Sequence, residues 1–253
     1  FYKIFLILNL MKINSLSIIF PFYNESLRIN KCFQDIIKFN KCNRSMKIEY
    51  VFVDDGSNDD TCKKIINFIK KNKKQINKKY KLVKLIKNTG KGEALKQGVL
   101  KSKNNWILTL DVDISVSLRQ IMSWSKKKLI SSNKKIFFGS RNLKNSKTYS
   151  KMHRLFIGYF FRLIIKLLFS INLKDTQCGY KLYYNKIAKK IFSKLTEKGF
   201  IHDVEITLLA KKYNFKIVEL PVIWTHKNNG KINILLDSIK MFLSLIILRF
   251  KIN

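Results

Sequence analysis

Two aspartates lie two residues apart in Asp111-Val112-Asp113, directly after the apolar segment WILTL at residues 106–110. Side chains at positions i and i+2 of an extended segment point the same way, so both carboxylates can face one ion. Carboxylate oxygens suit Mg²⁺ or Mn²⁺, and such an ion stabilises the charge on a nucleotide diphosphate leaving group. An ordinary turn is the alternative, because this short pattern is common by chance.

A second acidic segment, Asp54-Asp55-Gly56-Ser57, follows the apolar segment EYVFV at residues 49–53. A carboxylate at this point can accept hydrogen bonds from the N–H of a base or from ribose hydroxyls. The alternative is that the segment caps the next helix and turns the chain with its glycine.

A glycine-containing segment, Asn88-Thr89-Gly90-Lys91-Gly92, precedes a helical stretch. Glycine lets a backbone approach a ligand closely, and the N-terminus of a helix attracts anions. Lys91 adds a positive charge at this point. The spacing differs from that of a P-loop, and a plain loop is the alternative.

The elements that must position these residues alternate between strand-like and helix-like patterns. Such alternation predicts an α/β fold with a mostly parallel central sheet and helices on both faces. Ligands bind at the carboxyl ends of the strands in such sheets, and both acidic segments fall at these ends. We expect strands at residues 16–20, 49–53, 81–86, 106–110, 135–138 and 216–224, and helices at residues 26–39, 59–74, 92–101, 118–130, 155–169, 203–213 and 232–249.

The chain is strongly basic, with a formal net charge of +35, and 46% of its residues are hydrophobic. This charge favours an anionic partner such as a phosphorylated substrate or an anionic lipid, although compositional drift is the alternative for much of it. Two apolar stretches, residues 155–169 and 232–249, are typical of amphipathic helices in a membrane interface, with burial in the core as the alternative. We find no motif for nucleic-acid binding and expect no nucleic-acid partner.

The four cysteines form no C-x-x-C pair, which argues against zinc and for reduced thiols in a cytoplasmic setting. No apolar window free of charge is long enough to span a bilayer. We therefore expect a cytoplasmic protein that associates peripherally with a membrane.

The order of the segments resembles that of family 2 glycosyltransferases with the GT-A fold, which is Rossmann-like. Within that family the chain is most similar to dolichyl-phosphate β-glucosyltransferases and their bacterial polyprenyl-phosphate relatives. The resemblance extends from Leu16 to Arg249. In addition to the three segments above, it is carried by Pro21-Phe22-Tyr23-Asn24-Glu25, Gly139-Ser140-Arg141, Asp175-Thr176-Gln177-Cys178-Gly179-Tyr180-Lys181-Leu182, His202-Asp203-Val204-Glu205 and Val222-Ile223-Trp224-Thr225.

The resemblance implies a role for residues on the nucleotide-sugar side of the site. Lys91 would lie near the nucleotide, and Asp111 and Asp113 would position Mg²⁺ or Mn²⁺ and the ribose-diphosphate of the donor, with Asp113 counted among the catalytic residues. The uridine would be held by Pro21, Tyr23, Glu25 and Asp55, with Asp55 on the base.

The resemblance also implies an acceptor side. Arg141, counted as catalytic, would bind the acceptor phosphate, with Arg154 as a weaker candidate. Asp203 is the first candidate for a general base if the acceptor is a hydroxyl, or it would orient a donor hydroxyl if the acceptor is a phosphate. Further residues implied on this side are Gln177, Lys181 and Glu205. His202 departs from the family, because an aromatic residue is common at its position.

Taken together, these features predict an inverting transferase that moves glucose from UDP-glucose to dolichyl or polyprenyl phosphate. The alternatives are another donor, such as GDP-mannose or a UDP-N-acetylhexosamine, a saccharide acceptor, or a degenerate chain without activity. We expect residues 1–14 to be an unstructured or read-through segment and residues 15–253 to be one domain. Its parts would be a nucleotide-sugar half at 15–140, an acceptor half at 141–231 and a C-terminal amphipathic helix at 232–253.

Overall fold

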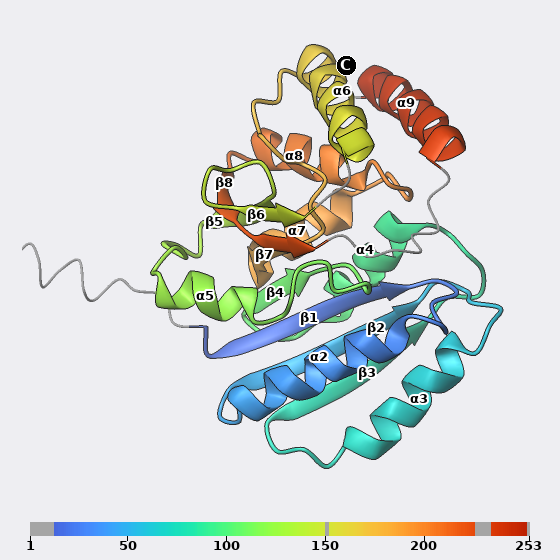
Figure 1. Cartoon of the computed structure of the whole chain (residues 1–253), viewed down its shortest axis with the longest axis vertical. Helices are drawn as coiled ribbons and strands as arrows, with labels where there is room; N and C mark the ends of the chain where they lie inside the picture. Colours follow the sequence, from blue (N-terminus) through green and yellow to red (C-terminus); the bar gives the residue numbers. More distant parts are fainter. Residues whose placement is uncertain (1–12, 150–151, 226–233, 252–253) are drawn as a thin grey trace, which may run out of the picture.

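The computed structural model describes residues 13–149, 152–225 and 234–251, and its centre is a seven-stranded sheet in the order β3-β2-β1-β4-β7-β5-β8 (Figure 1). Strand β7 is antiparallel to both of its neighbours, and the other pairs in this sheet are parallel. The predicted mostly parallel sheet is therefore confirmed. The strands are β1 (Ser15–Phe22), β2 (Lys47–Asp54), β3 (Lys78–Lys84), β4 (Trp106–Thr109), β5 (Lys135–Ser140), β7 (Lys181–Tyr184) and β8 (Lys216–Pro221).

Helices cover both faces of the sheet, as predicted. One apolar cluster packs under α2 (Ile29–Cys42), α3 (Thr61–Asn72) and α5 (Gln120–Lys126). The cluster on the other face packs under α4 (Lys91–Lys101), α7 (Asn185–Lys194) and α8 (His202–Lys212). This arrangement buries both faces of the parallel strands, which explains why these strands are almost continuously apolar.

Strand β2 shows how the sequence divides between the two faces. Tyr50 and Phe52 lie in the cluster under α2 and α3, whereas Val51 and Val53 lie in the cluster under α4. Successive side chains of a strand point to opposite faces, so a run of apolar residues serves two layers at once. All four side chains are fully buried, and each contributes roughly 1.5–3 kcal/mol of hydrophobic stabilisation.

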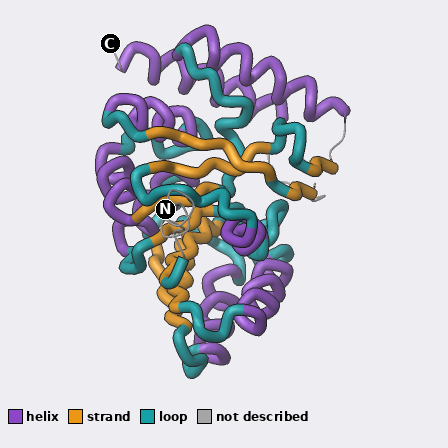
Figure 2. Tube along the Cα trace, turned by 90° about the vertical axis from the view of Figure 1, so that its left-hand side faces the viewer, coloured by secondary structure: helices purple, strands orange, loops and turns teal. Residues whose placement is uncertain are grey.

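Two further helices, α6 (Met152–Phe169) and α9 (Ile234–Lys251), lie together at the end of the molecule opposite α3 (Figures 1 and 2). They form a third apolar cluster with α8, through residues such as Ile165, Val204 and Leu245. None of the helices in the described ranges is long and apolar enough to cross a bilayer.

The structure differs from the sequence prediction in the strand expected at 216–224 and in the region of β7 and α7. The strand expected at 216–224 is divided into β8 and β9 (Ile223–Thr225), and β9 leaves the main sheet to pair with β6 (Lys147–Tyr149). Strand β7 and helix α7 were not predicted. The unstructured segment expected at residues 1–14 lies outside the described residues except for Ile13 and Asn14.

Candidate active site

The site lies where several strand ends meet at one edge of the sheet. Strands β1, β2, β4 and β5 run parallel, so their carboxyl ends share that edge. Strand β7 runs the opposite way, so its first residue, Lys181, lies at the same edge. An open pocket is found here, lined by Leu110, Asp111, Ser115, Val116, Arg141, Gln177, Cys178, Gly179, Tyr180 and Trp224.

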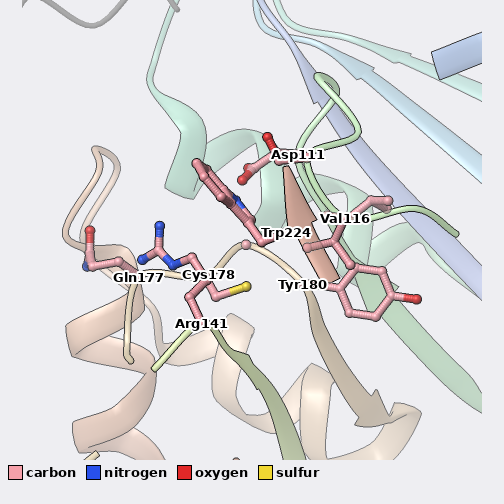
Figure 3. Close-up of a pocket in the computed structure, with 10 residues that line it drawn as sticks. Asp111, Val116, Arg141, Gln177, Cys178, Tyr180 and Trp224 are labelled. Atoms are coloured by element: carbon pink, nitrogen blue, oxygen red, sulfur yellow. The ribbon is translucent and has the colours of Figure 1, made fainter. Parts of the chain in front are cut away.

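Figure 3 shows how the charged side chains of the pocket are arranged. Asp111 lies on one side, Gln177 and the guanidinium of Arg141 lie on the other, and the ring of Trp224 lies between them in this view. The pocket therefore presents a carboxylate and a cation on different parts of its wall.

Asp111 forms an ion pair with Lys91, the first residue of α4, with 2.6 Å between Nζ and Oδ1. The Asp111 side chain remains 39% exposed, so it can still be reached from the pocket. Burial alone would raise the pKa of the Asp111 carboxyl, but the charge and hydrogen bond of Lys91 outweigh this effect and lower it. The two residues therefore stay ionised near neutral pH.

Gly179 makes room for this ion pair. A Cβ atom added to Gly179 would lie 2.5 Å from Oδ2 of Asp111, far inside ordinary contact distance. The absence of a side chain at Gly179 is therefore what lets the chain before β7 pass so close to the end of β4.

Asp113 is turned toward its own chain. Its Oδ1 accepts a hydrogen bond of 2.9 Å from the backbone N–H of Ser115, and its Oδ2 accepts one of 2.8 Å from the Ser115 hydroxyl. These contacts hold the turn after β4 in place. Each oxygen of an ionised carboxylate has a second lone pair, so this arrangement leaves further acceptor capacity.

Asp55 holds the glycine-containing loop of residues 88–92. Its Oδ1 accepts hydrogen bonds of 2.8 Å from the N–H and the hydroxyl of Thr89, and its Oδ2 accepts one of 2.8 Å from the N–H of Gly90. Asp55 itself is buried. Asp55, which is expected to contact the uridine base, thus also fixes the loop that places Lys91 next to Asp111.

The N-terminus of α4 is capped from another part of the chain. The carbonyl oxygen of Lys198 accepts hydrogen bonds from the N–H groups of Gly92 (2.7 Å) and Glu93 (3.3 Å). These amides are therefore already bonded, which corrects the expectation that the helix N-terminus itself offers them to an anion. The positive charge at this point is supplied by the Lys91 side chain.

The end of β1 places the remaining residues expected near the uridine. Pro21 pairs with Val53 inside the sheet, and Tyr23 follows with 37% of its surface exposed. The carboxylate of Glu25 is bound by the Arg28 guanidinium at 2.8 Å and 2.5 Å. The negative charge of Glu25 is therefore already paired with the positive charge of Arg28 before any ligand binds.

Arg141 follows β5 and forms a two-point ion pair with Asp175. The distances are 2.7 Å from Nε to Oδ2 and 2.8 Å from Nη2 to Oδ1, and the backbone N–H of Arg141 donates to the same carboxylate at 2.9 Å. Burial alone would raise the pKa of Asp175, but the charge of Arg141 lowers it. The guanidinium also lies 5.8 Å from the centre of the Trp224 ring. Arg141 is thus held rigidly at the pocket wall.

A buried charge cluster lies next to the pocket, at the start of β7 and α8. Nζ of Lys181 contacts Oδ1 of Asp203, and Nε2 of His202 lies 3.2 Å from the same oxygen. Burial alone would raise the pKa of Asp203, but the charges of His202 and Lys181 hold it well below its usual range. Asp203 is therefore a poor proton acceptor near neutral pH, and this state gives no support to a general-base role.

The other residues expected on the acceptor side have different positions. The Glu205 carboxylate is bound within the chain, which gives no support to contact with the sugar acceptor. It accepts hydrogen bonds from the N–H and hydroxyl of Thr196 and from the N–H of Glu197. Glu205, in the first turn of α8, therefore holds the loop between α7 and α8 in place. Gln177 lines the pocket, and its buried Nε2 has no hydrogen-bond partner among the described residues. The Arg154 side chain lies outside the described part of the structure.

With the fold and the site described, the chain can be compared with known proteins. A model of the family described as "Glycosyl transferase family 2" matches residues 17–192. The chain belongs to glycosyl transferase family 2. It is therefore an enzyme that transfers a sugar, and the predicted family is confirmed.

Relatives of this glycosyltransferase are similar over most of its length. Dolichyl-phosphate beta-glucosyltransferase of Dictyostelium discoideum is 34% identical, over 93% of this chain and 74% of the relative. The Saccharomyces cerevisiae protein of the same name is 33% identical, over 92% of this chain and 74% of the relative.

A solved structure of a related fold supports the GT-A assignment. Glucosyl-3-phosphoglycerate synthase from Mycobacterium tuberculosis, in complex with Mn²⁺, UDP-glucose and glycerol 3-phosphate, gives a TM-score of 0.60 at 16% identity. The match covers 93% of this chain and 80% of that one.

Three contributors to the site of this glycosyltransferase were not assigned a role from the sequence. Asp175 and Trp224 lie in segments that carried the family resemblance, so the signal was present although the role was not. The sequence contains no pattern that identifies the Lys198 carbonyl, because the backbone carbonyl of any residue can accept a hydrogen bond.

Proposed function

We propose that this glycosyltransferase moves glucose from UDP-glucose to dolichyl or polyprenyl phosphate, with inversion, at a membrane surface. The observation that carries the proposal is the pocket that places Asp111 and Arg141 on its wall. The relatives named dolichyl-phosphate beta-glucosyltransferase, which match almost the whole chain, support this donor and acceptor.

In the proposed reaction an oxygen of the lipid phosphate attacks C1 of glucose. The bond from C1 to the β-phosphate oxygen of UDP-glucose breaks, and its electron pair leaves with UDP. One displacement in line inverts the configuration at C1. Residues that hold the two substrates in line are worth several powers of ten in rate, because they replace a bimolecular encounter.

The state of Asp203 favours a phosphate acceptor over a sugar hydroxyl. A hydroxyl acceptor needs a general base, whose pKa would best lie near the working pH. Asp203 has a pKa far below that, and its carboxylate is already bound by Lys181 and His202. A phosphate monoester is already ionised near neutral pH, so it needs binding and orientation instead. Arg141 beside Trp224 supplies a fixed cation for this purpose.

The donor diphosphate would lie near Lys91 and Asp111. Lys91 is held at the start of α4 by its ion pair with Asp111, and it would neutralise one charge of a bound nucleotide. Tyr23 and Asp55, at the ends of neighbouring strands, would take the uridine. The Asp55 carboxylate already organises residues 88–92, so the same residue would contribute both to the base and to the phosphates.

A divalent cation fits the donor set at the end of β4. Within the described ranges, no group of three histidine, cysteine or acidic side chains is arranged as a complete metal site. Mg²⁺, however, is usually held by one or two carboxylates together with substrate phosphates. Asp111, exposed to the pocket, and Asp113, with acceptor capacity left, would be its protein ligands. When bound, such an ion neutralises charge that develops on the diphosphate.

The transfer assay tests the proposal directly. Purified protein is incubated with Mg²⁺ or Mn²⁺, polyprenyl phosphate and one radiolabelled nucleotide sugar at a time, and the label is extracted into organic solvent. Transfer from UDP-glucose supports the proposal. Transfer from GDP-mannose alone would show that GDP-mannose is the donor instead, and the absence of lipid-bound label with every donor would overturn the proposal.

A pair of matched variants tests the metal ligands. Asp113→Asn is expected to abolish transfer, and Asp60→Asn makes the same chemical change at an exposed position before α3 and should leave the rate unchanged. Equal rates for the two variants would remove Asp113 from the site.

The outer faces of α6 and α9 form what we call the apolar helical surface, and we propose that it contacts the membrane. Eight large apolar side chains are exposed on these two helices, accompanied by basic residues such as Arg162 and Lys240. This combination is typical of helices that lie in a lipid interface, and the net charge of +35 would favour anionic lipid. The eight residues are Tyr159, Phe160, Leu163, Leu167, Phe242, Leu243, Ile247 and Phe250.

Vesicle flotation tests the membrane contact. The protein should float with vesicles that contain phosphatidylserine, and Leu167→Glu should weaken this binding. Ile76→Glu places the same charge at a residue that is 84% exposed but lies outside the apolar helical surface, so it should bind as the wild type does. Failure of the wild-type protein to float would contradict the membrane contact without affecting the transfer assay.

A further inference from the structure

Glu205 is a buried carboxylate that the proposed reaction does not use. The residue is 6% exposed, and none of the ion pairs among the described residues includes it. Its Oε2 accepts a hydrogen bond of 2.6 Å from the N–H of Glu197, and its Oε1 accepts bonds of 3.0 Å and 2.9 Å from the N–H and hydroxyl of Thr196. Hydrogen bonds to a carboxylate are stronger than those to a neutral acceptor. Glu205 therefore binds one short stretch of the loop between α7 and α8 firmly.

The carbonyl groups of the same loop are bound by α4. The carbonyl oxygen of Leu195 accepts a hydrogen bond of 2.8 Å from Nζ of Lys96. The carbonyl oxygen of Lys198 accepts the bonds from the N–H groups of Gly92 and Glu93 at the first turn of α4. The loop thus lies between two helices, with N–H groups bound to α8 and carbonyl groups bound to α4.

The loop also fits closely against the residue that precedes Lys91. Gly90 has a φ of +109°, and a Cβ atom added to it would clash with the carbonyl oxygen of Lys198. On its other side, the N–H of Gly90 donates to Oδ2 of Asp55 at 2.8 Å. Lys91 follows directly and pairs with Asp111 at 2.6 Å. The position of Lys91 therefore depends on two supports, the Asp55 carboxylate and the loop between α7 and α8.

We propose that Glu205 is a positioning residue for the donor side of the site. Its carboxylate holds the loop between α7 and α8 against the start of α4, and this contact sets the position of Lys91. Glu205 then acts on the donor through Lys91 and does not touch it. The inference rests on the proposed function, in that Lys91 is the residue that serves the donor diphosphate.

Amide hydrogen exchange tests the contact without any substrate. In Glu205→Ala the N–H of Gly92 should exchange roughly tenfold faster than in the wild type, because the loop that caps it is released. The N–H of Gly139, which donates to the Tyr180 carbonyl between β5 and β7, should keep its protection. Glu205→Gln, which keeps the shape of the side chain and one acceptor oxygen, should give an intermediate rate at Gly92. Unchanged exchange at Gly92, or equal acceleration at Gly92 and Gly139, would overturn the proposal.

The kinetics of transfer then test the effect on the donor. Glu205→Ala should raise the KM for UDP-glucose about 3–10-fold and leave kcat within about threefold. Glu219→Ala is the matched control, because Glu219 also binds two backbone N–H groups of a loop, at 2.9 Å and 2.8 Å, but these belong to residues 174 and 175 beside Arg141. Its KM for UDP-glucose should stay within about twofold of the wild-type value. An unchanged KM in Glu205→Ala, or an equal rise in Glu219→Ala, would contradict the positioning role.

A double-mutant cycle with Lys91 identifies the route of the effect. If Glu205 acts through Lys91, adding Glu205→Ala to a Lys91→Met protein should change the KM for UDP-glucose less than about twofold. A rise as large as that in the wild-type background would show that Glu205 acts independently of Lys91 and would overturn the proposal. A Lys91→Met protein with the wild-type KM would contradict the proposed donor role of Lys91, whereas the exchange rate at Gly92 would still decide whether Glu205 holds the start of α4.

Discussion

Gly179→Ala is the sharpest test of how the pocket positions Asp111. The added Cβ would lie 2.5 Å from Oδ2 and 2.6 Å from Oδ1 of Asp111, whereas ordinary contact begins at 3.4 Å. The carboxylate must therefore shift by about 0.9 Å, which breaks the geometry of its 2.6 Å ion pair with Lys91. Gly179 does not have a positive φ, so backbone strain does not contribute to the effect.

The size of the effect follows from this displacement. A misplacement of about 1 Å in a catalytic site can cost about 10²-fold in rate, which corresponds to about 2.7 kcal/mol of transition-state stabilisation. The fold should be much less affected, because overpacking against a partly exposed side chain costs about 1 kcal/mol, at the low end of such substitutions. We therefore expect kcat to fall about 10²-fold with a small change in melting temperature.

The assay is transfer from labelled UDP-glucose to polyprenyl phosphate in detergent, with thermal unfolding followed by circular dichroism. Gly158→Ala is the matched control, because among the described side chains a Cβ there meets only Arg162, at 3.4 Å, and Ala favours a helix interior over Gly by about 0.5–1 kcal/mol. A Gly179→Ala protein with wild-type kcat would refute the idea that Asp111 must keep this position, and so would an equal loss in Gly158→Ala.

Three further predictions follow from the ion pairs. Lys91→Met should raise the KM for the nucleotide sugar about 10–100-fold, because charged hydrogen bonds contribute about 1.5–3 kcal/mol, whereas Lys91→Arg should recover part of the affinity; equal KM values for Lys91→Met and the wild type would contradict this. Arg141→Ala should lower the free energy of unfolding by about 3 kcal/mol in urea titrations, since it leaves the buried Asp175 without its counter-charge, and an unchanged midpoint would contradict this. Asp175 and Asp203 both have a lowered pKa in the folded protein, so their stabilisation is complete above the unfolded value of about 3.9 and is lost as the pH falls below it. Urea midpoints should therefore be similar at pH 7 and pH 5 and much lower at pH 3, and equal midpoints at pH 5 and pH 3 would contradict this assignment.

The sequence was sufficient to place the acidic segments at one edge of the sheet. Alternation of strands and helices fixes a parallel sheet, and in such a sheet the residues that follow each strand gather together. Asp55 and Asp111 could therefore be predicted to be neighbours although they are far apart in the chain. In the structure the loop of residues 88–92 connects the two, because Asp55 binds Thr89 and Asp111 forms an ion pair with Lys91.

Strand β7 could not be predicted by the same reasoning. Alternation favours parallel strands, and β7 is a short strand that begins with a lysine. A lysine at a strand end is usually exposed, but Lys181 is 1% exposed because Asp203 supplies its counter-charge. That partner comes from a helix that follows later in the chain, so no local pattern reveals it.

The roles of individual carboxylates were also beyond the sequence. Glu205 was expected near the acceptor, but it binds the N–H groups of residues 196 and 197. Asp203, two residues earlier in the same helix, faces Lys181 and His202 instead. The two side chains differ in partner because they lie on different sides of the first turn of α8, and only the packed structure determines what each side meets.

The reversed direction of β7 has a consequence for how such an enzyme can diversify. The chain leaves the central sheet after Ser140 and returns at Lys181, and both points lie at the pocket edge. Residues 141–180, which include α6, therefore form one segment between β5 and β7. Its first residue, Arg141, and its last residue, Tyr180, both line the pocket. Exchange of this one segment in evolution would replace the proposed acceptor contacts and the proposed lipid-facing helix together, while the strands proposed to hold the nucleotide remained untouched.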